Sequence, residues 1–455
     1  MALPNEDKSD ALGRGTTNPR PDSYVEVRVT TMTANVFFDG TANNYFNTKA
    51  GTPSRGGSYA NAYSNVAWLY TRAQKGLSDS VNVYIEGIGT LKGKNDSTYS
   101  KGTGWSGLGG YGMVARAMLA FDEVKRTLKA KKTDDNQKLV IANLTLNVFG
   151  FSRGAAAARY FVSTLHSDEN PWTNLPKRSL DEQANDFADH SKDQVDDQGV
   201  KIANFSVNFI GLYDTVSSVG LTPKNDIGPY RQQIKRGACK FVFHLTARDE
   251  FRTHFALNRI STATGGKFGY EMQIPGAHSD IGGGYNNNDT EALRWTSELA
   301  KGYQEHLSWW GWYRDSDIHS EYRDRPGRQF WDCWTDTRTI SNEYHKVGLK
   351  TMADMIKKSI NSDAIAFDYL PTLTSDKDIA FIQGRLNQMA QSRYQLGIQG
   401  TDDIVEAKLW PAGQPWSQAI YRRYFHFSAD FHKTGMEPHI NGNGKPSRLT
   451  AGDHG

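Results

Sequence analysis

The chain has 455 residues and nearly balanced charge, with 53 basic and 50 acidic side chains and a formal net charge of +3. This balance gives no indication of a nucleic-acid partner. The two cysteines, Cys239 and Cys333, lie far apart without metal-ligand spacing, which argues against a disulfide framework and against a structural zinc site.

Residues 1–23 are polar and rich in turn formers, and they are predicted to form a flexible arm. The sequence shows no basic and apolar leader at its start and no run of about 18 apolar residues. We therefore expect synthesis in the cytoplasm without a signal peptide, so that any export uses another route. Ordered structure is expected to begin near Val25.

The first predicted strand ends in a polar turn. Val25, Val27 and Val29 alternate with polar residues, and residues 35–38 then lead into Asp39, Gly40 and Thr41. A turn at the carboxyl end of a strand is where open α/β sheets build their sites. A capped helix is expected from Ser64 and a strand over 81–85, and this alternation is typical of a largely parallel sheet. Residues 102–107 match G-x-G-x-x-G but stand too far from the preceding strand, so a loop is expected there, before a helix over about 112–128.

The chain is organised around residues 143–166, where an apolar strand pattern leads directly into an alanine-rich helix pattern. Between them, Gly150, Ser152 and Gly154 form a G-x-S-x-G motif. At a strand-to-helix junction this motif holds the serine in a strained turn with its Oγ exposed. The first amides of the helix point toward Ser152, where they can stabilise an oxyanion. The sequence therefore predicts Ser152 as a nucleophile.

The two partners of a catalytic triad follow at the ends of later strands. A polar insertion over 167–200 is interpreted as a possible lid or partner-binding loop. The next strand ends at Asp214, residues 249–260 are expected to be helical, and His278 lies in a glycine-framed loop after another strand. The order Ser152, Asp214, His278 is that of α/β hydrolases.

Two other acids, Asp249 and Asp280, compete with Asp214 for the role of orienting His278. Asp280 is close enough in sequence to hold its own loop through backbone amides instead. The other histidines lack the order or the setting of a strand followed by a glycine loop. The expected mechanism is acyl transfer through Ser152, with the oxyanion held by the backbone amide of Arg153 and by an amide of the turn at Gly40 and Thr41.

Four blocks in series carry a resemblance to a known family. They are FFDGTANN at 37–44, GFSRGAAAAR at 150–159, GLYDTV at 211–216, and PGAHSDIGGGY with ALRW at 275–285 and 292–295. Together they resemble the uncharacterised-lipase-type α/β hydrolase domain of type VI secretion phospholipase effectors of the first lipase-effector family. The match spans about Val25 to Tyr303.

The resemblance implies a fold, an activity and partners. It implies an α/β-hydrolase catalytic domain over 24–303, with a mostly parallel sheet flanked by helices, and the triad Ser152, Asp214 and His278. Family members are phospholipases A that act on membrane glycerophospholipids. They need no cofactor, are delivered by the secretion machinery and its spike into the periplasm of rival bacteria, and are neutralised in the producer by an immunity protein.

Residues 304–455 resemble the family less clearly and are predicted to form a helical, aromatic-rich extension packed on the catalytic domain. Its tryptophans suit a core, although an exposed cluster would suit a bilayer interface.

Other functions stay open at this point. One is hydrolysis of another ester. Another is metal-assisted phosphodiester hydrolysis with Asp39, Asp214, His278 and Asp280 as ligands, although no H-E-x-x-H motif is present. The last is a non-catalytic binding module.

Overall fold

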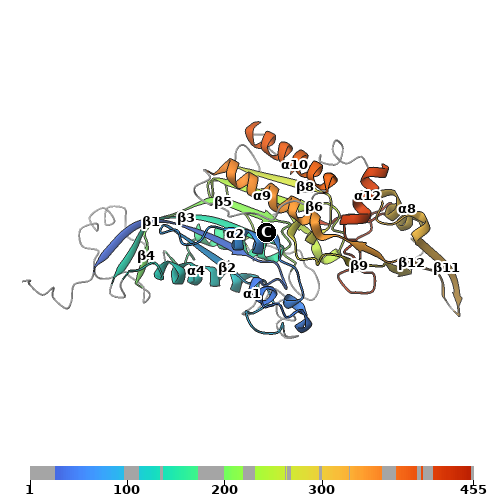
Figure 1. The fold of residues 1–455 in the computed structure, drawn as a ribbon, viewed down its shortest axis with the longest axis horizontal. Helices are drawn as coiled ribbons and strands as arrows, with labels where there is room; N and C mark the ends of the chain where they lie inside the picture. The colour runs from blue at the N-terminus through green and yellow to red at the C-terminus, as the bar shows by residue number, and fades with distance from the viewer. Residues whose placement is uncertain are drawn as a thin grey trace, which may run out of the picture.

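A parallel β-sheet forms the centre of the molecule (Figure 1). The computed structural model describes residues 26–96, 112–133, 137–172, 199–218, 231–261, 263, 268–296, 300–326, 328–360, 376–396, 401–402 and 413–451. The sheet has eight strands in the order β14-β8-β6-β5-β3-β1-β2, with β4 paired to β3, and all its pairs are parallel. Its strands are β1 (Val27–Phe38), β2 (Ser80–Ile85), β3 (Lys138–Phe151), β4 (Val200–Ile202), β5 (Phe205–Tyr213), β6 (Phe241–Ala247), β8 (Gly269–Ile274) and β14 (Thr401–Asp402).

Both faces of this sheet are buried. Every residue of β6 is buried, as expected for a central strand of a parallel sheet with helices on both sides. Because successive side chains of a strand point to opposite faces, Val148 belongs to one hydrophobic core and its neighbour Phe149 to the other.

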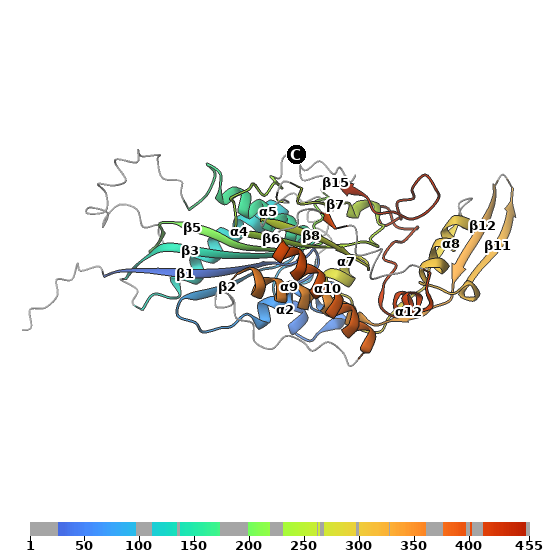
Figure 2. The same ribbon diagram turned by 90° about the horizontal axis from the view of Figure 1, so that it is seen from above.

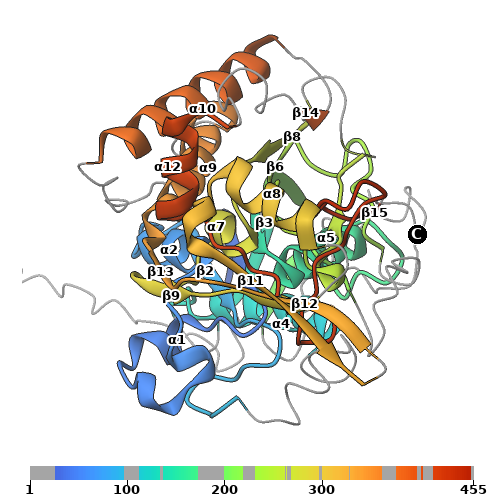
Figure 3. The same cartoon turned by 90° about the vertical axis from the view of Figure 1, so that its right-hand side faces the viewer.

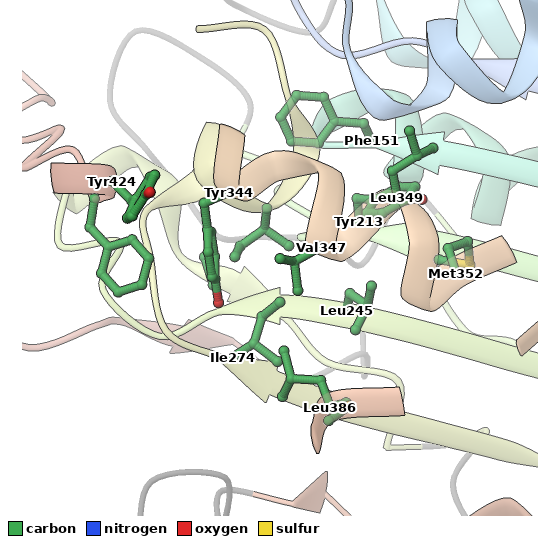
Figure 4. Packing of buried hydrophobic residues seen from close by; sticks show 14 of the residues in the cluster. Phe151, Tyr213, Leu245, Ile274, Tyr344, Val347, Leu349, Met352, Leu386 and Tyr424 are labelled. Carbon is green, nitrogen blue, oxygen red and sulfur yellow. The ribbon is translucent and has the colours of Figure 1, made fainter. Parts of the chain in front are cut away.

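Helices cover the two faces as separate layers (Figure 2). One layer consists of α4 (Met113–Lys129) and α5 (Arg153–Leu165), and the other of α2 (Asn65–Arg72), α9 (His345–Ser359) and α10 (Lys377–Leu396). On the second face, Val347 and Met352 of α9 pack beside Leu245 and Tyr213 of the sheet (Figure 4). The predicted fold class, a mainly parallel sheet flanked by helices, is confirmed.

The residues after 303 contain helices and also strands. The helices α8 (Ala300–Trp310) and α12 (Pro415–Tyr424) lie near a three-stranded antiparallel sheet of β10 (Arg294–Thr296), β11 (Ile318–Arg325) and β12 (Arg328–Thr335) (Figure 3). The aromatic segment over 328–334 is therefore a strand. The aromatic residues after 303 divide between core and surface, because Trp312 is buried whereas Trp331 is 45% exposed.

Shorter elements complete the described chain. The segment 249–260 is not the expected helix, because the carboxylates of Asp249 and Glu250 accept hydrogen bonds from loop amides. It forms the 3₁₀ turn η4 (Thr253–Phe255) and a two-residue strand instead. The remaining elements are α1 (Tyr45–Lys49), α7 (His278–Gly282), the 3₁₀ turns η1 (Pro53–Arg55), η2 (Gly57–Tyr59), η5 (Asp315–Asp317) and η6 (Asn342–Tyr344), and the strand pairs β7 (Leu257–Asn258) with β15 (Thr450–Ala451) and β9 (Asp289–Glu291) with β13 (Arg338–Ile340).

Several sequence predictions lie outside the described residues. These are the arm over 1–23, the glycine-rich loop over 102–107 and most of the polar insertion over 167–200. Within the described ranges, no helix combines the length and the apolar character needed to cross a bilayer.

Candidate active site

The candidate site lies at the point where the strand order of the sheet reverses, beside β1. Strand β1 lies between β2 and β3, so the connection after β1 and the later connections to β3 and β5 run toward opposite edges of the sheet. Such switch points leave a crevice at the carboxyl ends of the strands. Ser152 directly follows β3, and the turn with Gly40 and Thr41 follows β1.

Ser152 occupies a sharp turn between β3 and α5. Its φ of 59° and ψ of −130° place a non-glycine residue in a strained conformation. The flanking glycines permit the turn, because a Cβ on Gly150 would lie 2.5 Å from Ala155 Cα and one on Gly154 would lie 2.2 Å from the Asp39 carbonyl oxygen. The local geometry is that of a nucleophile elbow.

Asp214 and His278 are in direct contact. Asp214 follows β5 with a φ of 43°, and its Oδ2 lies 2.6 Å from Nδ1 of His278, the first residue of α7. The imidazole packs between two aromatic rings, with centroid distances of 4.6 Å to Phe151 and 5.1 Å to Phe255. Ser152 and His278 line one cavity of about 280 Å³. The structure thus brings the three predicted residues together.

The charge on Asp214 is balanced by Arg448. Burial alone would raise the pKa of Asp214, but the charge of Arg448 and the hydrogen bond with His278 hold that pKa well below its ordinary value. Burial lowers the pKa of His278, and the hydrogen bond and charge of Asp214 offset this effect only in part. At neutral pH the carboxylate is therefore ionised and the imidazole is neutral, the forms that a general base and its orienting acid require.

The buried pair of Glu250 and Arg252 supports the loop that carries His278. Glu250 accepts a hydrogen bond from the His278 amide at 3.2 Å and from the Ser428 hydroxyl at 2.9 Å. It also forms a buried ion pair with Arg252, with an Nη2 to Oε2 distance of 2.7 Å. Burial raises the pKa of Glu250, but the charge and hydrogen bonds of Arg252 outweigh burial and lower it to about 2.

The predicted oxyanion donors come from the turn after β1 and from the start of α5. The Gly40 amide donates to Oδ1 of Asp39 at 2.7 Å, so this amide is already engaged. Thr41 and Arg153 both line the cavity beside Ser152, and Arg153 begins α5, at the helix end where amides have no intrahelical acceptor. The backbone amides of Thr41 and Arg153 are therefore the better candidates.

Asp39 holds this turn through a buried network. Its carboxylate accepts hydrogen bonds from the Ser64 hydroxyl at 2.6 Å and the Tyr84 hydroxyl at 2.5 Å. Burial raises the pKa of Asp39 to about 6, although the bonds from Ser64, Tyr84 and Gly40 act in the opposite direction. Asp39 thus links α2 and β2 to the turn after β1.

The competing acids have other partners. Asp249 accepts from the Gly276 amide at 2.8 Å and from the Tyr421 hydroxyl at 3.0 Å. Asp280 accepts from the Ala277 amide at 2.9 Å and lies 2.7 Å from Nδ1 of His426. Among the described residues, no three His, Cys, Asp or Glu side chains are grouped so as to hold a metal ion.

The sequence did not point to Glu250, Arg252 or Arg448. Glu250 and Arg252 stood inside a stretch interpreted as helical, where alternate charges suggest an exposed face. Arg448 is separated from Asp214 by 234 positions, and no motif surrounds it. The loop from Pro275 to Ser279 gives one indication of such residues. A buried loop that carries a histidine needs neighbouring polar groups to accept its hydrogen bonds.

A strand–serine–helix elbow on a mainly parallel sheet flanked by helices defines a hydrolase of the esterase and lipase class. The family model described as "T6SS, Phospholipase effector Tle1-like, catalytic domain" matches residues 33–302, which is more than half of the chain. The chain belongs to this family, and it is a type VI secretion phospholipase effector of the Tle1 type.

One solved structure supports the fold, and a second is reported beside it. The structure of the Tle1 effector bound to the VgrG spike from the type 6 secretion system matches with a TM-score of 0.58 and 21% sequence identity, over 98% of this chain and 98% of that chain. A structure of an uncharacterized protein from Pseudomonas aeruginosa reaches a TM-score of 0.39 and 16% identity, over 81% of this chain and 52% of that one. No curated protein matches the chain.

Proposed function

We propose that the chain is a phospholipase A that cleaves acyl esters of membrane glycerophospholipids through Ser152, His278 and Asp214. The observation that carries this proposal is the elbow serine sharing a cavity with an imidazole whose other ring nitrogen contacts a buried carboxylate. Membership of the Tle1-like family supports the substrate class.

The proposed reaction has two acyl-transfer steps. His278 removes the proton of Ser152, whose oxygen attacks the ester carbonyl, while Asp214 holds the imidazole in the tautomer with Nδ1 protonated. The amides of Arg153 and Thr41 stabilise the oxyanion. The protonated His278 then gives its proton to the leaving lysophospholipid oxygen. Water, activated by the same imidazole, releases the fatty acid from the acyl-enzyme.

The biological setting is proposed from the family and from its solved relative. Because that relative is a Tle1 effector bound to a VgrG spike, we propose that this chain is carried by a spike protein into the periplasm of a rival bacterium. An antibacterial role would require a cognate immunity protein in the producing cell. We also propose that residues 24–303 are the catalytic domain and that 304–455 complete it.

The test is hydrolysis of defined phospholipids by purified protein, with products identified by mass. Replacing Ser152 with Ala is expected to abolish fatty-acid release, because only the hydroxyl oxygen can form the acyl-enzyme. Ser163→Ala, a matched change on α5 outside the cavity, should retain activity. Wild-type rates in Ser152→Ala would rule out this nucleophile. The positions of the released chains on doubly labelled lipids distinguish A1 from A2 cleavage.

A further inference from the structure

The carboxylate of Asp214 is held by an arginine from the C-terminal end of the chain. Arg448 Nη1 donates to Oδ1 of Asp214 at 2.6 Å, and Nη2 donates to Oδ2 at 3.0 Å. This is the two-pronged geometry by which a planar guanidinium fixes the orientation of a carboxylate. Arg448 lies outside residues 33–302, the part of the chain that the family model matches.

The guanidinium is itself fixed and protected from water. It donates to the carbonyl oxygen of Ala247 and, at 3.3 Å, to that of Phe255. Its side chain is 5% exposed and that of Asp214 is fully buried. The backbone on both sides is anchored. Before Arg448, the Ser447 amide donates to the His439 carbonyl oxygen, and after it the Leu257 amide donates to the Leu449 carbonyl oxygen and β15 pairs with β7. This ion pair is therefore screened little by solvent.

Each carboxylate oxygen of Asp214 has two donors. Oδ1 accepts from Arg448 and from the Ala247 amide at 2.8 Å, while Oδ2 accepts from Arg448 and from Nδ1 of His278 at 2.6 Å. The direction of the bond to His278 is consequently set by Arg448 together with the Ala247 amide. Without the guanidinium, the carboxylate could rotate and the imidazole would lose its fixed plane.

We propose that Arg448 is a positioning residue for the hydrolytic reaction, which holds the carboxylate of Asp214 in line with His278. The inference rests on the proposed function of Asp214 and His278. It assigns to the C-terminal segment a part in catalysis.

The charge of Arg448 is expected to act on His278 through Asp214. An ionised Asp214 favours the protonated imidazole, and a cation behind that carboxylate reduces this preference. Removing the cation should therefore raise the pKa of His278 and move the acid limb of kcat/KM to higher pH. The charged and titratable groups around His278 and its cavity are Arg153, Asp214, Glu250, Arg252, His254, Tyr285 and Arg448. All but Arg448 stay unchanged in an Arg448 variant.

The experiment compares Arg448→Gln and Arg448→Lys in the full-length chain, with a soluble short-chain phosphatidylcholine as substrate. Arg448→Gln should lower kcat by ~10-fold to ~100-fold, as expected for a misplaced base, with little change in KM. Its acid limb should move to higher pH. Arg448→Lys keeps the charge but loses the planar fork, so kcat should fall while the acid limb stays at the wild-type position.

Arg338→Gln is the matched control, because Arg338 is also a buried arginine that joins a C-terminal segment to the preceding domain. It pairs with Glu291 at 2.5 Å and donates to the carbonyl oxygens of Tyr421 and Phe425, away from the candidate triad. This variant should lose thermal stability but keep the wild-type pH profile.

Several results would overturn the inference: an unchanged kcat in Arg448→Gln, an unmoved acid limb in that variant, or a similar shift of the limb in Arg338→Gln. If Arg448→Gln does not fold, Arg448→Lys decides, since wild-type kcat or a shifted limb there contradicts the proposal. Labelling of Ser152 by a fluorophosphonate in the wild type tests the proposed function separately from the role of Arg448. Labelled Ser152 with unaffected Arg448 variants refutes only the role of Arg448, whereas full activity of Ser152→Ala refutes the proposed function.

Discussion

Replacing Gly154 with Ala tests whether the elbow and the turn after β1 form one rigid unit. Gly154 is the second residue of α5, and a Cβ there would lie 2.2 Å from the carbonyl oxygen of Asp39 and 2.6 Å from that of Phe38. A carbon–oxygen contact needs slightly more than 3 Å, so α5 must move by about 1 Å from the end of β1. The added methyl would therefore separate Ser152 from the turn that carries Thr41.

Two magnitudes follow. Overpacking of this kind costs about 1–3 kcal/mol of stability. A displacement of about 1 Å between nucleophile and oxyanion donors costs on the order of 100-fold in kcat. Both should be visible, as a lower midpoint of thermal unfolding and as slower release of fatty acid per folded molecule.

Gly384→Ala is the matched control, since Gly384 lies in helix α10 with no atom within 4 Å of the added Cβ. The same substitution should here stabilise the protein by ~0.5–1 kcal/mol, because alanine loses less backbone entropy in a helix. Activity should be unchanged. If Gly154→Ala unfolds at the wild-type temperature, or if it loses stability but keeps full activity, the proposed coupling between elbow and turn is refuted.

Two further substitutions have defined outcomes. The folded pKa of Asp39 is raised from 3.8 to about 6, so its stabilising contribution is complete below pH 3.8 and is lost as the pH rises through 6. Between pH 4 and pH 8, the free energy of unfolding of the wild type should therefore fall by up to ~3 kcal/mol relative to that of Asp39→Asn. A difference in stability between the two proteins that does not change with pH would contradict the raised pKa. Asp214→Asn should lower kcat by ~10³-fold to ~10⁴-fold at neutral pH through the wrong imidazole tautomer, as steady-state kinetics can show. Near-normal kcat would remove Asp214 from the mechanism.

The strands and the elbow could be predicted because local patterns determine them. The apolar run before Ser152 and the alanines after it require a strand and then a helix, and Gly150 and Gly154 fit only a close approach of the two. Asp214 and His278 were predicted from their positions after strands, since the carboxyl ends of parallel strands meet at one edge.

The remainder depends on contacts between distant segments. The segment over 249–260 has a helical pattern, yet Asp249 and Glu250 are drawn to the amides of the His278 loop, and these tertiary bonds outweigh helix propensity. Likewise, the aromatic segment over 328–334 pairs with β11 and becomes a strand. Arg448 could not be predicted, because an isolated arginine near the end of a chain carries no local pattern.

The most direct test of the central claim is covalent labelling by a fluorophosphonate, followed by identification of the modified peptide by mass. A serine activated by a neighbouring imidazole reacts with this probe, whereas other serines do not. The account predicts a single adduct on Ser152 that disappears in His278→Ala together with phospholipid hydrolysis. An adduct on another serine, or an unlabelled enzyme that still releases fatty acid, would contradict it.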